Sequence, residues 1–108
     1  MNLDLVRMFS EWNLKSFHGK LPVPEIRWNS RLKSSAGRFI PGAKRSIIEI
    51  AGYLTQEENA EALIRDTMGH EMIHLRQARL GNSGNHNALF ARLARRVCAA
   101  HGFDPKSF

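Results

Sequence analysis

Apolar residues recur every three or four positions over residues 2–18, the spacing that places one apolar stripe along an α-helix. Asn2 is suited to cap the start of this helix, and Gly19 can take the left-handed conformation that commonly ends one. Residues 20–24 contain two prolines, which favour an extended backbone after the helix. The first predicted element is therefore an amphipathic helix over residues 2–18.

The next part of the chain favours short strands. Polar and apolar residues alternate over residues 25–28, and two similar stretches follow at 37–40 and 46–50. Residues 41–44 contain the proline and glycine of a turn, so we expect the last two strands to form a hairpin. Because strands this short need a helix packed on one face, the sheet is expected to carry helices.

Two further helices are predicted in the second half of the chain. Thr55 and Glu58 fit a capping box, in which each side chain binds the exposed backbone N–H of the other, so a helix is expected from about residue 55 to Leu80. Residues 81–85 are rich in glycine and asparagine and predict a reversal. The last helix is expected over roughly residues 87–101. The pattern as a whole predicts an α+β fold, with helices packed on a small three-stranded β-sheet.

The composition fits one ordinary globular domain over residues 1–108. No apolar run approaches the roughly 18 residues that a membrane span needs. Residues 1–12 carry three charged side chains where a secretory signal would be apolar. Cys98 is the only cysteine, which excludes an internal disulfide and a zinc ribbon. We therefore expect a cytoplasmic protein without a membrane partner, and the sequence does not indicate its oligomeric state.

Positive charge is concentrated in one part of the chain. The net charge is +6, and residues 72–103 contain five arginines and no acidic residue. A one-sided basic region can attract nucleic acid or acidic protein, and a solvated helix face explains the same pattern equally well. The candidate contacts to nucleic acid, DNA in particular, are Arg76, Arg79, Arg92, Arg95 and Arg96.

The strongest chemical signal is the sequence HEMIH at residues 70–74. Residues four apart lie on one face of a helix, so His70 and His74 present both imidazoles to one point. Glu71 lies beside that point, where it can act as a general base on a metal-bound water without being a ligand. Two histidine ligands and a glutamate base are the arrangement found in zinc peptidases. The motif therefore predicts a zinc site that hydrolyses peptide bonds of protein substrates.

A catalytic zinc ion usually has three protein ligands and one open position. His86 is the best third ligand, because the reversal at residues 81–85 can fold the last helix back towards the first two ligands. His101 is the rival, but it lies 15 residues farther on, about 22 Å along a continuous helix. His18 and His101 are therefore expected not to bind the metal.

Three further features carry weaker signals. Asp66 lies one turn before His70 and can accept the other ring N–H of that histidine, although a solvated carboxylate fits equally well. Tyr53, the only tyrosine, can polarise a substrate carbonyl, but a core or rim position is the simpler expectation. Residues 45–50 are expected to form an edge strand, to which an extended peptide substrate can be added.

Together these residues resemble the SprT-like (Spartan-type) zinc metalloprotease domain family. The similarity covers most of the chain and is carried, in order, by the motifs FHGKLP (17–22), IRW (26–28), AG (36–37), IEI (48–50), TMGHEMIH (67–74) and GNHNALF (84–90). It implies a minimal zincin-like peptidase fold, with His70, His74 and His86 on one zinc ion per chain and Glu71 catalytic. Eukaryotic relatives degrade proteins crosslinked to DNA in a DNA-dependent manner, which makes DNA-associated and DNA-crosslinked proteins candidate substrates. Larger relatives add a zinc ribbon and DNA-binding or partner-binding tails.

Two other functions compete with a peptidase. One is a metal-containing nucleic-acid-binding module with little or no proteolytic activity, but the basic region offers no interleaved aromatic residues on which bases would stack. The other is a structural zinc domain, which normally closes with four protein ligands, and no fourth ligand is evident. The sequence therefore favours an open, catalytic site.

Overall fold

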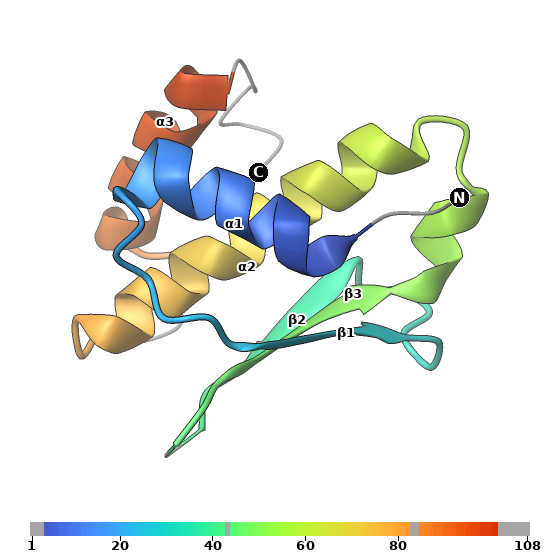
Figure 1. Ribbon diagram of the computed structural model, residues 1–108, viewed down its shortest axis with the longest axis horizontal. Coiled ribbons are helices and arrows are strands. Elements are labelled where there is room, and N and C mark those ends of the chain that lie inside the picture. Colours follow the sequence, from blue (N-terminus) through green and yellow to red (C-terminus); the bar gives the residue numbers. More distant parts are fainter. Residues whose placement is uncertain (1–3, 43, 83–84, 102–108) are drawn as a thin grey trace.

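The computed structural model describes residues 4–42, 44–82 and 85–101. It has three helices packed with a small three-stranded mixed sheet, which confirms the predicted α+β fold. The helices gather on one face of the sheet (Figure 1). The elements in chain order are α1 (Leu5–Phe17), β1 (Glu25–Asn29), β2 (Gly37–Ile40), β3 (Ile47–Ala51), a 3₁₀ helix η1 (Gly52–Gln56), α2 (Ala60–Arg79) and α3 (Ala88–His101).

The sheet has the order β1-β3-β2. β2 and β3 pair antiparallel, as the predicted hairpin requires, and β1 pairs parallel with the other side of β3. The expectation that residues 45–50 form an edge strand is therefore wrong. β3 buries Ile48 and Ile50 on the helix side and Glu49 on the opposite side, and burial on both faces is typical of a central strand. The outer strands of the sheet are β1 and β2.

A buried carboxylate links the three strands on the face away from the helices. Glu49 accepts hydrogen bonds from Arg27 Nε at 2.8 Å, Asn29 Nδ2 at 3.1 Å and Arg38 Nε at 2.9 Å. Burial by itself raises the pKa of Glu49, but the three hydrogen bonds and the charge of Arg38 outweigh it and lower the pKa to about 2. The carboxylate therefore stays ionised and joins β1 and β2 to β3.

α1 begins one turn later than the sequence suggested. Asp4 caps it by accepting a hydrogen bond from the backbone N–H of Arg7 at 3.1 Å, whereas Asn2 lies outside the described residues. The helix ends at Phe17, followed by His18 and Gly19, which both take positive φ angles.

The extended segment after α1 is held against that helix. The buried side chain of Asn13 donates to the carbonyl oxygen of Leu21 at 3.0 Å and accepts from its N–H at 3.1 Å. Asn13 thereby satisfies both polar groups of Leu21 and fixes the path of the chain from α1 to β1.

The capping box predicted at Thr55 and Glu58 is wrong. Thr55 lies in η1, where its hydroxyl donates to the carbonyl oxygen of Gly52 at 2.8 Å, and the N-cap position of the following helix is Asn59. Glu57 is extended, and α2 begins only at Ala60. The tertiary fold uses these residues for a turn between β3 and α2, although the helix does end near Leu80 as predicted.

α2 lies at the centre of the fold, since it contacts β2 and β3 as well as α1 and α3. The largest apolar side chains of the core are almost completely inaccessible to solvent, and they are Phe9, Trp12, Ile48, Ile50, Ile64, Met68, Met72, Ile73 and Val97. No helix in the described part of the chain combines the length and apolar character that a membrane span needs. α2 therefore packs against the sheet and against both of the other helices.

Candidate metal centre

Two of the predicted ligands project from the middle of α2. His70 is half-buried and His74 is buried, and their spacing of four residues places both rings on one face of the helix. Glu71 lies on the adjacent face and is also buried. The packing of α2 against β2 and β3 therefore fixes the backbone from which these three side chains extend.

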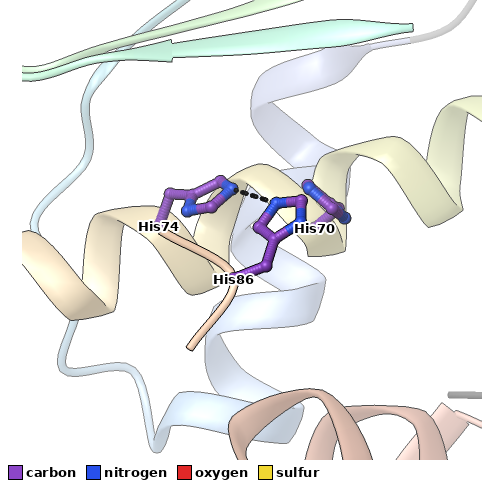
Figure 2. Close-up of side chains that lie close together, drawn as sticks. All are labelled: His70, His74 and His86. Atoms are coloured by element: carbon purple, nitrogen blue, oxygen red, sulfur yellow. Dashed lines mark hydrogen bonds between the residues drawn. The ribbon is translucent and has the colours of Figure 1, made fainter. Parts of the chain in front are cut away.

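His86 joins the pair from the segment that precedes α3. Its Nε2 atom lies 3.3 Å from Nε2 of His74, and each of the three histidines offers a ring nitrogen within 4.8 Å of the others. Figure 2 shows the three rings converging, two from α2 and one from the neighbouring loop. The structure thus brings together the three histidines that the sequence singled out, and they could hold a metal ion.

Of the other two histidines, His18 is not part of this cluster. His18 follows α1, where its Nε2 accepts a hydrogen bond from Arg96 Nη2 at 3.3 Å. His101 ends α3, but its side chain lies outside the described residues. That His101 is not a ligand therefore stays a prediction.

Phe90 forms one wall of the cluster. Its ring is stacked on His86, with the ring centroids 4.4 Å apart, and lies 5.0 Å from the rings of both His70 and His74. Phe90 is buried on the first turn of α3, four residues after His86. This contact limits the positions that the otherwise exposed ring of His86 can take.

The surroundings of His70 and His74 favour the neutral forms of these two rings. Burial, as the largest cause, and the nearby rings of His74 and His86 together lower the pKa of His70 to about 4. Burial also lowers the pKa of His74, against a smaller opposing effect of its hydrogen bond to Gln77. Neutral imidazole is the form that binds a metal ion, so His70 and His74 are kept in the form that metal binding would need.

Glu71 lies at a cavity next to the cluster. The cavity has a volume of about 350 Å³ and is lined by Ser35, Ala36, Gly37, Asp66, Thr67, His70 and Glu71. Burial raises the pKa of Glu71 to about 7. The carboxylate of Glu71 thus lies close to β2, since a Cβ atom on Gly37 would be 3.3 Å from its Oε2, and it shares the cavity with His70.

Asp66 lines the same cavity, one turn before His70. Its Oδ1 atom is buried, and no group in the described part of the chain donates a hydrogen bond to it. Burial raises the pKa of this carboxyl group. The hydrogen bond from the ring of His70 that the sequence suggested stays a prediction.

Gln77 was not among the residues predicted from the sequence. Its side chain is fully buried, and its Oε1 atom lies 2.8 Å from Nδ1 of His74. The signal available in the sequence was a polar residue three positions after a ligand, on the same side of the helix. Tyr53, by contrast, is partly buried in η1 and packs against the core, as expected.

The five arginines that are candidate contacts to nucleic acid lie in different parts of the structure. Arg76 and Arg96 line one small pocket together with His18 and Lys20. Arg79 lines a different cavity, and Arg92 and Arg95 are exposed on α3. None of these five arginines forms an ion pair with a described carboxylate. Their contact with nucleic acid stays a prediction.

Known proteins that resemble this chain were sought over its whole length, including the three clustered histidines. No curated protein sequence matches the chain significantly. The model of the SprT-like family matches residues 5–107, a range that includes α1, the sheet and all three clustered histidines. The chain therefore belongs to the SprT-like family.

Proposed function

We propose that this protein is a zinc-dependent metallopeptidase that hydrolyses peptide bonds of protein substrates. The observation that carries the proposal is the convergence of His70, His74 and His86 beside the buried carboxylate of Glu71. Membership of the SprT-like family supports a metallopeptidase-type domain. DNA-associated or DNA-crosslinked proteins are the proposed substrates, on the strength of the resemblance to DNA-dependent relatives.

The donor set fits one zinc ion per chain. Three imidazole nitrogens suit zinc, and three protein ligands leave the open position that a catalytic site requires. A closed structural zinc site would need a fourth protein ligand. Among the described residues, no fourth histidine, cysteine or carboxylate belongs to the cluster. When bound, the ion would act as a Lewis acid that makes water more acidic and polarises the substrate carbonyl.

Glu71 is the proposed general base. It takes a proton from the attacking water at its carboxylate and returns it to the leaving amine, so that one side chain serves both proton transfers. Its side chain is largely buried but lines the cavity, so a water molecule or a substrate in the cavity can reach the carboxylate. Such positioning raises the effective concentration of the base at the reacting bond.

The outer edge of β2 is the proposed docking site for the substrate backbone. In the described structure β2 pairs only with β3, so its other edge has free backbone groups. A Cβ atom on Gly37 would lie 3.3 Å from Oε2 of Glu71, so β2 passes directly over the proposed base. An extended peptide added to this edge would run past Glu71. β2 thus takes the place of residues 45–50 as the proposed edge for the substrate, because residues 45–50 lie mostly in the central strand.

Glu71→Gln tests the proposed function. The variant should retain zinc, because the three ligands are untouched, and should lose roughly 10²- to 10⁴-fold in cleavage rate, because an amide cannot take the proton. Zinc content by elemental analysis and cleavage of an unfolded protein should be measured together, with Glu61→Gln at the exposed start of α2 as the matched control. Unchanged cleavage in a zinc-loaded Glu71→Gln protein would rule out the assignment.

A nucleic-acid-binding module with little proteolytic activity is the second candidate function. The observation that favours it is the pocket that gathers Lys20, Arg76 and Arg96 with His18. Four cationic or polar side chains with no described acid among them suit a phosphate group. The absence of cleavage by zinc-loaded protein, together with salt-sensitive DNA binding, would favour this function over a peptidase.

A further inference from the structure

The buried side chain of Gln77 connects the two halves of the metal cluster. On one side its Oε1 lies 2.8 Å from Nδ1 of His74. On the other side its Nε2 donates to the backbone carbonyl of Asn85 at 2.9 Å and to the side-chain oxygens of Asn82 at 3.2 Å and Asn87 at 3.3 Å. These asparagines belong to the segment that carries His86, so a single amide joins α2 to the loop of the third ligand.

The orientation of this amide follows from the partners of Gln77. The carbonyl oxygen of Asn85 can only accept, so the NH₂ group of Gln77 must face it and Oε1 must face His74. Because Oε1 also can only accept, Nδ1 of His74 must carry the proton. In the neutral ring, Nε2 then holds the free lone pair, and Nε2 is the atom that lies 3.3 Å from His86.

The loop side of the network fixes the approach of His86. Asn87 donates from its side chain to Asn82 at 2.9 Å, and its Oδ1 caps α3 by accepting from the N–H of Phe90 at 3.1 Å. Gln77 therefore holds residues on both sides of His86, and through Asn87 it holds the turn of α3 that carries Phe90. None of these contacts is readable from sequence spacing, since the loop partners lie five to ten residues away.

We propose that Gln77 is a positioning residue for the metal: it selects the Nδ1–H tautomer of His74 and anchors the loop that presents His86. In neither role does the Gln77 side chain contact the reacting atoms. Partners of this kind typically change metal affinity by about 10- to 100-fold when removed. The inference concerns metal binding, so it can be tested whether or not the chain proves to be a peptidase.

The tautomer is measured first, from the ring ¹⁵N chemical shifts of His74 in metal-free, ¹⁵N-histidine-labelled protein at a pH where the ring is neutral. Wild type should show the proton on Nδ1. A proton on Nε2 in wild type would overturn the proposal without any variant. Zinc affinity is then measured by competition with a chelator for Gln77→Leu, which should mix the tautomers and weaken binding by about 10- to 100-fold.

Two further variants separate positioning from loss of packing. Gln77→Glu keeps an acceptor for His74 but loses the N–H donors to the loop, so it should retain the Nδ1–H tautomer and still bind zinc more weakly. Asn13→Leu is the matched control, a buried amide that bonds a backbone segment away from the cluster. It should lower thermal stability and leave both readouts as in wild type. If Asn13→Leu weakens zinc binding as much as Gln77→Leu, or if Gln77→Leu leaves tautomer and affinity unchanged, the proposal is wrong.

A different observation concerns a cavity at the end of α2 that carries positive charge. Its volume is about 410 Å³, and its walls come from the segment before β1, from the β2–β3 connection and from the end of α2. Its lining includes Pro22, Pro24, Lys44, Arg45, Ala78 and Arg79. Ala78 follows His74 by one turn of α2, about 6 Å along the helix axis.

The cations of this cavity have no acidic partner in the described structure. Arg45 donates to the backbone carbonyls of Val23 at 3.3 Å and Pro24 at 3.1 Å, which fix its guanidinium without neutralising it. Lys44 and Arg79 are exposed, and neither forms an ion pair with a described carboxylate. Three positive charges therefore face one solvent-accessible space.

The cavity lies at the end of β2, along which the proposed substrate would run. β2 starts at Gly37, over Glu71, and ends at Ile40, directly before Pro41 of the cavity wall. An extended peptide rises about 3.3 Å per residue, so a chain docked on β2 would reach the cavity about three to four residues from the bond beside Glu71. We infer that the cavity is a substrate subsite that favours acidic side chains at this distance from the cleaved bond, an inference that rests on the proposed function.

The test uses matched peptides that carry aspartate or lysine three and four residues from one cleavable bond, on either side of it. Wild type should prefer the acidic peptide on one side, by about 5- to 10-fold in kcat/KM for two exposed charge pairs. Lys44→Glu/Arg79→Glu should abolish or invert the preference, while Arg92→Glu/Arg95→Glu, which changes the same net charge on α3, should keep it. Cleavage that ignores peptide charge, or a preference that survives in the Lys44/Arg79 variant, overturns the subsite alone. Zinc-loaded wild type that cleaves no peptide or protein overturns the proposed function and the subsite with it.

Discussion

The three histidines differ in how firmly the chain holds them. His74 is buried on α2 and bonded to Gln77, whereas His86 is exposed on a loop and is held by the ring of Phe90 and by the anchored residues around it. The position of His86, the proposed third ligand, thus depends most on the rest of the fold.

His86→Ala should weaken zinc binding by more than the roughly 10- to 100-fold typical of outer partners, because a direct ligand is lost. His18→Ala is the matched control, since His18 contacts Arg96 and not the cluster, and it should bind zinc like wild type. Chelator competition on both variants and on His101→Ala, which is also expected to bind normally, checks the ligand set. Equal losses for His86→Ala and either of the other two would contradict it.

Glu49 makes stability depend on pH. Its pKa in the folded protein is about 2, below its ordinary value of 4.5, so its ionised form stabilises the fold above about pH 4.5 and this contribution is lost as the pH falls towards 2. Because Arg27 and Arg38 are half-exposed and screened by solvent, we expect the contribution to be about 1–3 kcal/mol. Glu49→Gln should therefore be less stable at neutral pH and should lose less stability than wild type on acidification.

Urea unfolding at several pH values between neutral and about 2 measures this difference. Glu25→Gln is the control, because Glu25 pairs with the same Arg27 but is half-exposed, and surface pairs contribute little. A wild-type profile no steeper between pH 4.5 and 2 than that of Glu49→Gln would contradict the assignment.

At the scale of elements, the close approach of β2 to α2 places the strand edge over Glu71. A Cβ atom on Gly37 would lie 2.6 Å from Cγ2 of Thr67 and 2.9 Å from the carbonyl oxygen of Glu49. Only glycine leaves room for this approach, so the sequence Ala36-Gly37 has a packing role next to the proposed base.

Gly37→Ala should force β2 away from α2, lower the free energy of unfolding by about 1–3 kcal/mol and reduce cleavage. Gly52→Ala is the matched control, since its Cβ would meet its nearest neighbour, Ser30 Cα, at an ordinary 3.6 Å. Thermal unfolding and the cleavage assay on both variants test the difference. Equal stability of the two alanine variants would show that the space between β2 and α2 can accommodate a Cβ atom at residue 37.

At the scale of the whole molecule, the basic pocket depends on three segments that are far apart in the sequence. His18 and Lys20 follow α1, Arg76 comes from α2 and Arg96 from α3. A phosphate held there would contact all three, so any DNA binding should depend on the folded protein and not on the basic segment alone.

DNA affinity, measured by fluorescence anisotropy, should fall steeply as salt rises and depend little on base sequence. If Arg76 and Arg96 each contact a phosphate, Arg76→Ala/Arg96→Ala should reduce the slope of log affinity against log salt by about 2. Arg31→Ala/Lys33→Ala, which removes the same charge from the loop after β1, should leave the slope nearly unchanged. Equal effects of the two double variants, or binding by neither them nor wild type, would contradict a specific phosphate site.

Much of the fold and most of the metal cluster could be predicted, because the signals involved are local. The period of 3.6 residues per turn puts His70 and His74 on one face whatever surrounds the helix, and the glycine and asparagine residues before His86 favour a reversal through their own backbone preferences. The apolar spacing in α1 is equally a property of its own residues. The same reasoning failed at Thr55. Its hydroxyl could have capped a helix or bonded within a 3₁₀ turn, and the surrounding fold selected the 3₁₀ turn.

The sequence by itself therefore determined the helix that carries HEMIH, the α+β composition of elements and the identity of the histidines that converge. Only the tertiary structure decided that β3 is central, that β2 offers its edge to Glu71, that Gln77 bonds both His74 and the loop of His86, and that Arg76 and Arg96 share a pocket. The physical reason is that positions along one helix are fixed by its own repeat, whereas strand order and contacts between distant segments are set by which arrangement buries the most apolar surface with its polar groups paired.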